Sequence, residues 1–158
     1  MQVETVIEDP RWRALDLATL ANDAAAATFS HLALSELSLA CLGTDDIRIA
    51  ALNVEFRGKP SPTNVLSWPA ETLVPLSPGT EPPPPTEPEI GDIALAYETC
   101  FAEAEAAGIA PNTHVTHLVV HGILHLLGYD HDNDLDADLM EKTEIAILLS
   151  LGIDNPYA

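Results

Sequence analysis

The sequence is poor in positive charge, since only six lysines and arginines stand against 25 aspartates and glutamates among 158 residues. The formal net charge of −19 repels nucleic acid and anionic membranes at long range. This shortage therefore counts against a protein that binds nucleic acid through a broad basic surface. Any such binding would need a local cluster of cations.

Cysteine is also scarce, and Cys41 and Cys100 stand far apart with no C-x-x-C pair. Neither a disulfide framework nor a cysteine zinc site is indicated, which fits a reducing cytoplasm. The sequence has no run of 18 apolar residues, and MQVETVIEDP has neither the basic nor the apolar region of a signal peptide. We therefore expect a soluble cytoplasmic protein with no membrane partner.

A chain of 158 residues fits one domain, and no internal repeat divides it. Apolar periodicity and turn residues predict four strands and five helices. The strands are expected at 3–7, 36–43, 64–69 and 89–97, and the helices at 15–34, 44–58, 99–107, 111–128 and 135–151. We therefore predict a single α+β domain over residues 1–158, in which a small mixed sheet of about four strands packs against about five helices.

The second predicted helix, TDDIRIAALNVEF, has a recognisable start and an apolar side. Thr44 is the expected N-cap, because its hydroxyl can accept from an unpaired backbone N–H. The side expected to pack consists of Ile47, Ile49, Ala51, Leu52, Val54 and Phe56.

A proline-rich segment separates the last two predicted strands. PLSPGTEPPPPTEPE holds seven of the chain's 13 prolines, and proline cannot donate a backbone hydrogen bond. We expect residues 75–88 to form an exposed, polyproline-like loop that is dispensable for folding.

The stretch HGILHLLGYDH carries three histidines at the spacing of a metal site. His121 and His125 lie four residues apart on one face of the predicted helix, so both imidazoles can approach one ion. A left-handed Gly128 would end the helix and turn the chain back, which brings His131 toward the pair. Three imidazoles favour Zn²⁺ and leave a fourth position open, as in catalytic zinc sites. The alternative is a set of helix-packing histidines with no metal.

The resulting pattern, H-x-x-x-H-x-x-G-x-x-H, has the ligand spacing of the metzincins without their glutamate, because Gly122 follows the first histidine. In zinc peptidases that glutamate takes a proton from the attacking water and returns it to the amine. Glycine can do neither. A metal alone still lowers the pKa of water to about 7 and polarises a phosphoryl oxygen, so phosphodiester cleavage survives this loss better than proteolysis.

Three neighbours of the histidine triad are candidates for supporting roles. His117 is a poor third ligand, because it lies about 12 Å along the helix axis from His125. We expect His117 and His114 to orient the ligands or to pack in the core. Asp130 precedes the third histidine and is a candidate for the same orienting role.

Cleavage of a phosphoester also requires a fixed cation, and FRGKPSPTNVLSWP contains Arg57 and Lys59. Arg57 lies where the second predicted helix meets a glycine turn, and a guanidinium binds two phosphate oxygens at once. Arg57 is therefore a candidate catalytic residue and, with Lys59, a candidate substrate-binding residue. The alternative for Arg57 is an ordinary surface arginine.

Four segments together resemble a known family: LNVEFRGKPSPTNVLSWP, EIGDIALAY, HLVVHGILHLLGYDH and GIDNPY. In order and spacing they are similar to the bacterial YbeY proteins, also called ribosomal RNA maturation factors or probable endoribonucleases. The resemblance covers residues 44–158, and the histidine block is its most specific part. Phe56, Asn64 and Trp68 stand where tyrosine, aspartate and phenylalanine are common, and the proline-rich segment is longer than expected.

The resemblance implies one zinc ion held by His121, His125 and His131, with Arg57 as the family's functional arginine. It implies a single-strand-specific endoribonuclease that acts in maturation of the 16S ribosomal RNA 3′ end and in ribosome quality control. The implied partners are single-stranded ribosomal RNA and the small ribosomal subunit with its basic proteins. The negative charge then requires a local cationic groove at Arg57 and Lys59 or docking to those basic proteins, unless the acidity reflects a salty habitat.

Two other functions stay open at this point. The first is a metallohydrolase with another substrate, including a metzincin-like peptidase whose base is Asp130 or a glutamate of the last helix. The second is a ribosome-assembly factor whose zinc is mainly structural, which a fourth protein ligand would favour.

Overall fold

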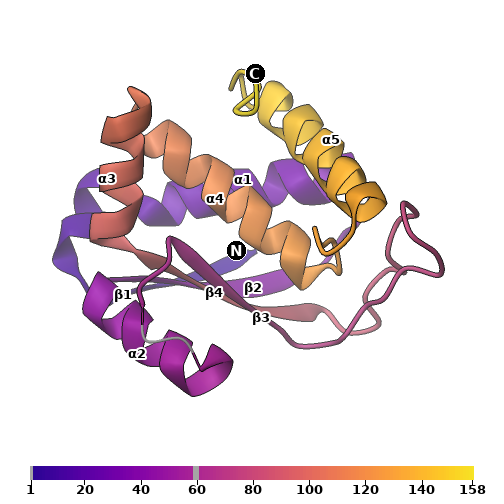
Figure 1. Ribbon diagram of the computed structural model, residues 1–158, viewed down its shortest axis with the longest axis horizontal. Helices are drawn as coiled ribbons and strands as arrows, with labels where there is room; N and C mark the ends of the chain where they lie inside the picture. The colour runs from indigo at the N-terminus through magenta and orange to yellow at the C-terminus, as the bar shows by residue number, and fades with distance from the viewer. Residues whose placement is uncertain (1, 59–60) are drawn as a thin grey trace.

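The computed structural model describes residues 2–58 and 61–158. The predicted α+β fold is confirmed: the sheet has four strands, and helices lie on both of its faces (Figure 1). In chain order the elements are β1 (Val3–Ile7), the 3-10 helix η1 (Pro10–Leu15), α1 (Leu17–His31), β2 (Ser38–Thr44), α2 (Asp46–Arg57), β3 (Val65–Pro69), β4 (Glu89–Ala96), α3 (Tyr97–Ala107), α4 (Pro111–Leu126) and α5 (Asp134–Ser150).

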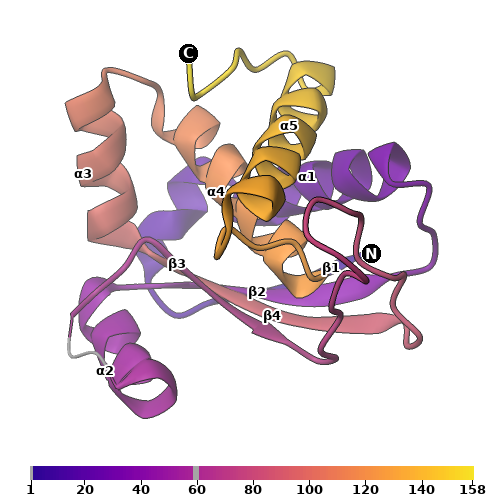
Figure 2. The ribbon, with the colours of Figure 1, turned by 45° about the vertical axis from the view of Figure 1, so that its right-hand side comes forward.

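The sheet is mixed, with strand order β1-β2-β4-β3. The first three strands in this order are parallel, whereas β3 runs antiparallel to β4. Helices α1 and α4 cover one face and α2 lies against the other, as Figure 2 shows from the side. Helix α5 packs on the outer side of α4 and α1. Helix α4 therefore lies between the sheet and α5, and its different faces pack against these two neighbours.

Alternation along the strands divides the apolar residues between two cores. Leu39 of β2 and Ile93 of β4 face α1 and α4, where they join the main core. Strand residues that point to the opposite face of the sheet, such as Leu66 and Ala94, join a small core beneath α2. The main core includes Trp12, Leu17, Phe29, Val119, Ile123, Leu124 and Ile147.

The short helix η1 was not predicted, and α1 is correspondingly shorter than expected. The side chain of Asp9 accepts from the backbone N–H of Arg11 and Pro10 begins the turn, which suits the residues at a helix start. Trp12 is fully buried in η1, and its indole N–H donates to the carbonyl of Thr44 over 2.8 Å. The ring also meets Tyr97 edge-on, with 5.5 Å between centroids. The η1 turn thereby covers one end of the sheet.

Two predictions about α2 are wrong. The N-cap is Asp45, whose carboxylate accepts from the backbone N–H of Arg48 over 2.8 Å, while Thr44 ends β2. The expected apolar side is not buried as a whole, because only Ile49 of that side is fully buried in the small core, with Leu52 partly buried beside it. The exposed apolar residues of this side are Ile47, Ala51, Val54 and Phe56, of which Phe56 meets the ring of Trp68 edge-on.

The proline-rich segment 75–88 has no helix or strand and is mostly exposed, as expected. It nevertheless forms hydrogen bonds at two points, one with α5 and one with a residue just after β3. The backbone N–H of Gly79 donates to Asp136 over 2.8 Å, and Thr86 binds the Glu71 carboxylate through its N–H and its hydroxyl. That the segment is dispensable for folding stays a prediction.

Both cysteines are free and buried. Cys41 lies in β2 and Cys100 in α3, and burial raises the pKa of Cys41 to about 12 and raises that of Cys100 as well. Within the part of the chain that the structure describes, no helix is long and apolar enough to cross a membrane.

Replacing Trp12 tests whether η1 is part of the cooperative core. Trp12→Ala removes a fully buried indole and leaves the Thr44 carbonyl without its donor, so the free energy of unfolding should fall by about 3–5 kcal/mol. Urea unfolding followed by circular dichroism measures this. The neighbouring exposed Arg13→Ala should change it by less than about 0.5 kcal/mol. Equal midpoints for the two variants would contradict the packing described.

Candidate metal centre

Helix α4 is apolar on most of its circumference and carries its histidines on the remaining side. Pro111 begins the helix, where its missing N–H costs no hydrogen bond. Val115, Val119 and Ile123 are fully buried, because α4 packs against the sheet, α1, α3 and α5. The partly exposed stripe consists of His114, His117, His121 and His125.

A glycine turn places the third histidine beside this stripe. Gly128 has φ of +98°, as the predicted left-handed turn requires. A Cβ on Gly128 would lie 2.4 Å from the carbonyl oxygen of Leu73, so the close approach also demands glycine. Beyond the turn, the Asp130 carboxylate accepts from the backbone N–H of His131 over 2.8 Å. The turn and this hydrogen bond fix the backbone that carries His131.

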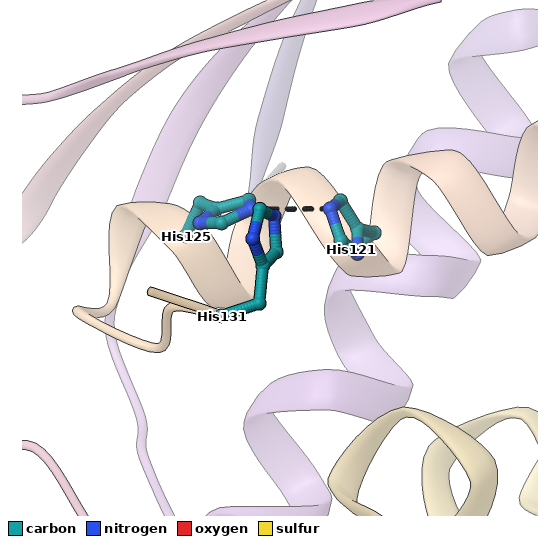
Figure 3. Close-up of side chains that lie close together, drawn as sticks. All are labelled: His121, His125 and His131. Carbon is teal, nitrogen blue, oxygen red and sulfur yellow. Dashed lines mark hydrogen bonds between the residues drawn. The ribbon is translucent and has the colours of Figure 1, made fainter. Parts of the chain in front are cut away.

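The three predicted ligands come together, as Figure 3 shows. Each of His121, His125 and His131 offers a ring nitrogen within 4.8 Å of the other two. The Nε2 atoms of His121 and His125 lie 3.1 Å apart. Two nitrogens on a tetrahedral zinc with bonds of about 2.0–2.1 Å are about 3.3 Å apart, so this donor set fits a zinc ion.

The protonation of His125 also suits a metal ligand. Burial, and next the neighbouring His121, lower the pKa of His125 to about 4. At neutral pH this imidazole is therefore uncharged and has a free lone pair.

Packing against the sheet explains why the first histidine is followed by glycine instead of glutamate. Gly122 is buried, and a Cβ there would lie 3.2 Å from Ile93 and 3.3 Å from Val65 and from the Ser67 hydroxyl. The Ser67 hydroxyl donates to the Gly122 carbonyl over 3.3 Å. A glutamate side chain at this position would have to displace these neighbours, and since the residue is glycine, any general base must come from elsewhere.

A cleft of about 610 Å³ opens beside the histidines. His125 and His131 lie on its wall together with Arg57 from the end of α2 and Ser67 from β3. Arg57 is exposed and is the one lysine or arginine among the described residues that line the cleft. The acidic residues of the lining are Glu71, Asp130, Asp132 and Asp136. The cleft can therefore hold a phosphate only near Arg57 or a bound cation.

The other predicted residues fall at different places. Lys59 lies outside the described residues. His114 does not reach the triad, because its Nε2 binds Glu103 over 2.8 Å. His117 binds a carboxylate behind the triad, that of Glu144, over 2.9 Å.

Glu144 of α5 was not singled out from the sequence, although it is the most buried carboxylate of the described residues, at 1 % exposure. Its oxygens accept from His121, His117 and Tyr157. Burial is the largest single effect and opposes ionisation, but these hydrogen bonds outweigh it and lower the pKa of Glu144 to about 2. Glu144 is therefore a carboxylate, and it lies behind His121 and is not among the residues lining the cleft. A glutamate of the last helix as general base, considered from the sequence, finds no support here.

The fold and the triad together define a class: α+β proteins with a candidate three-histidine metal site at the end of a helix, beside an open cleft. The family model described as Endoribonuclease YbeY matches residues 3–152. The chain belongs to this family. The match extends the resemblance seen in residues 44–158 to the N-terminal part of the domain.

Similar proteins support this membership over most or all of their length. Proteins named Endoribonuclease YbeY are 53% identical over 155 residues in Paracoccus denitrificans, 50% over 160 in Jannaschia sp. and 54% over 167 in Ruegeria pomeroyi. These alignments cover 98–99% of this chain and 89%, 100% and 98% of the relatives. The solution structure of TM1509 from Thermotoga maritima shares the fold, with a TM-score of 0.59 at 19% identity over 95% of this chain and 91% of that chain. The family is one of endoribonucleases, which cut RNA at internal bonds.

Gly128→Ala tests the role of the turn in assembling the triad. The variant combines left-handed strain of about 1–2 kcal/mol with a contact too short for any Cβ, so it should lose stability and bind zinc more weakly than the parent. Gly108→Ala is the matched control, because Gly108 has φ of +68° and no heavy atom within 4 Å of its Cβ position. Thermal unfolding and zinc titration compare the two. Equal zinc affinity for both variants would rule out a special role of Gly128.

Proposed function

We propose that the chain is a zinc-dependent endoribonuclease specific for single-stranded RNA. It acts in the cytoplasm, in maturation of the 16S ribosomal RNA 3′ end and in ribosome quality control. Membership of the YbeY family supports cleavage of RNA. The single observation that carries the metal-dependent mechanism is the shared cleft, whose wall includes both Arg57 and the candidate ligands His125 and His131.

The residues of the cleft have complementary parts in this reaction. His121, His125 and His131 would hold the zinc ion, which lowers the pKa of a water and polarises a phosphoryl oxygen when bound. The Arg57 guanidinium binds the scissile phosphate through two oxygens and stabilises the charge that develops on them. Gly122 cannot relay a proton, which favours a phosphodiester over a peptide substrate.

The charge distribution also bears on the partners. Four carboxylates line the cleft around Arg57, so RNA gains little from long-range attraction. A chain with a net charge of −19 is complementary to the basic proteins of the small ribosomal subunit. We therefore propose that docking to those proteins brings the single-stranded RNA to Arg57.

One observation favours a second candidate function, a ribosome-assembly factor with a mainly structural zinc. Asp130 and Asp132 offer carboxylate oxygens within 4.8 Å of a ring nitrogen of His131. If one of them closed the coordination shell, the metal would have no position left for a substrate.

Metal analysis tests the candidate ligands. Purified protein loaded with zinc should contain about one ion per chain, and His125→Ala should lose it, because two imidazoles seldom retain zinc. His114→Ala is the control on the same helix and should keep the metal, since His114 binds Glu103 instead. Less than about 0.2 ion per chain in the parent, or full retention by His125→Ala, would contradict the site.

Arg57→Ala separates the enzyme from the assembly factor. It removes the cation of the cleft and leaves all three imidazoles, so zinc content should persist while cleavage of single-stranded RNA falls about 100-fold. Arg57→Lys should recover only part of the rate, because an ammonium cannot bind two oxygens in a plane. Arg48→Ala, on the same helix but paired with Glu8 outside the cleft, should cut at the parental rate.

A parental rate in Arg57→Ala would refute the phosphate-binding role. Absence of zinc-dependent cleavage in the parent protein would favour the assembly factor.

A further inference from the structure

The buried carboxylate of Glu144 is not accounted for by the reaction described above. A carboxylate that loses contact with water costs several kcal/mol unless it is paired and hydrogen-bonded. Glu144 is 1 % exposed and lies on α5, between α4 and the C-terminal segment. The interactions of the Glu144 carboxylate must therefore offset a substantial cost of desolvation.

Three donors converge on Glu144, two from α4 and one from the C-terminal segment. Its Oε1 accepts from Nδ1 of His121 over 2.5 Å. Its Oε2 accepts from Nε2 of His117 over 2.9 Å and from the hydroxyl of Tyr157 over 2.5 Å. His117 and Tyr157 also meet ring to ring, with 5.5 Å between centroids. Both oxygens are occupied, so the carboxylate has one defined orientation.

The contact with His121 has a chemical consequence at the other side of that ring. A carboxylate oxygen can only accept, so Nδ1 of His121 carries the proton. In the neutral imidazole the lone pair is then on Nε2. This is the nitrogen that lies 3.1 Å from Nε2 of His125, on the side where the triad converges. Glu144 thus sets both the tautomer and the orientation of His121.

We propose that Glu144 is a positioning residue for the metal centre, and that Tyr157 and His117 hold it in place. The proposal rests on the zinc site of the proposed function and adds the residues that prepare its first ligand. Carboxylates that accept from a metal-binding histidine raise the basicity of the ring and typically change metal affinity by about 10–100-fold when replaced. Residues 144 and 157 are far from His121 in sequence, so the C-terminal part of the chain contributes to metal binding.

A purely structural role predicts something different. If the network only attached α5 and Tyr157 to α4, its loss would lower stability and leave the tautomer and metal affinity of folded protein unchanged. The pair formed by Glu103 and His114 offers the matched control, because it is also a carboxylate bound to a histidine of α4, at 2.8 Å, but away from the triad.

Two measurements on the full chain test the proposal. Zinc affinity is obtained by competition with a chelator, and the tautomer of His121 in zinc-free protein by ¹⁵N NMR of the imidazole nitrogens. Glu144→Gln should bind zinc about 10–100-fold more weakly and lose the uniform Nδ1–H tautomer. Tyr157→Phe should shift both in the same direction by less, and Glu103→Gln should match the parent in both.

The outcomes separate this proposal from the proposed function. If Glu144→Gln has the zinc affinity and the His121 tautomer of the parent protein, the positioning role is overturned. If Glu144→Gln does not fold, Tyr157→Phe decides, and parental values for that variant overturn the proposal. If the parent itself binds no zinc, the metal-dependent function fails, whereas the His121 tautomer still decides the positioning role.

Discussion

The close contact of α4 with the sheet at Gly122 is the constraint on which the candidate site depends. With only a hydrogen at this position, the helix approaches β3 and β4 until Ile93, Val65 and Ser67 meet its backbone. This contact fixes the rotation of α4 about its axis, so the histidine stripe turns away from the sheet, toward α5 and the cleft. Gly122 therefore has two effects: it replaces the glutamate base of zinc peptidases, and its contact with the sheet orients the histidine ligands.

The same arrangement divides the surroundings of the triad into two sides. Behind His121 the carboxylate of Glu144 is dry and fully hydrogen-bonded, whereas the carboxylates of the cleft face solvent beside Arg57. Negative charge on both sides favours a bound cation and disfavours a bare phosphate. In the proposed reaction, a substrate anion therefore meets attraction only close to Arg57 and to the cation that the triad would hold.

Most of the fold could be predicted because its elements have strong local signals. Branched residues alternate in the strands, and Gly58, Gly108 and Gly128 follow helices at positive φ. The three histidines were also predictable, since their spacing is itself a local geometry. The sequence predicts the N-cap one residue too early because Thr44 and Asp45 are both good caps, and only strand pairing shows that Thr44 belongs to β2.

The predictions fail where the burial of a side chain depends on contacts with residues that are distant in sequence. The apolar side chains of α2 suggest an amphipathic helix, but in the small core beneath it only Ile49 of these side chains is fully buried, with Leu52 partly buried. Glu144 was missed because a glutamate in a helix is ordinarily solvated, and its partners come from α4 and the C-terminal segment. A buried Trp12 in η1 could have been suspected from its size, although its sequence neighbours gave no periodic pattern.

The placement of the two thiols has a practical consequence for labelling. Cys41 and Cys100 are buried and held as thiols, while the candidate metal ligands are all nitrogen donors. Reagents that attack thiolates in the folded state reach neither cysteine and leave the candidate centre alone. A single cysteine introduced at an exposed position, such as the tip of the 75–88 loop, would carry a fluorophore or spin label selectively without prior removal of the native pair.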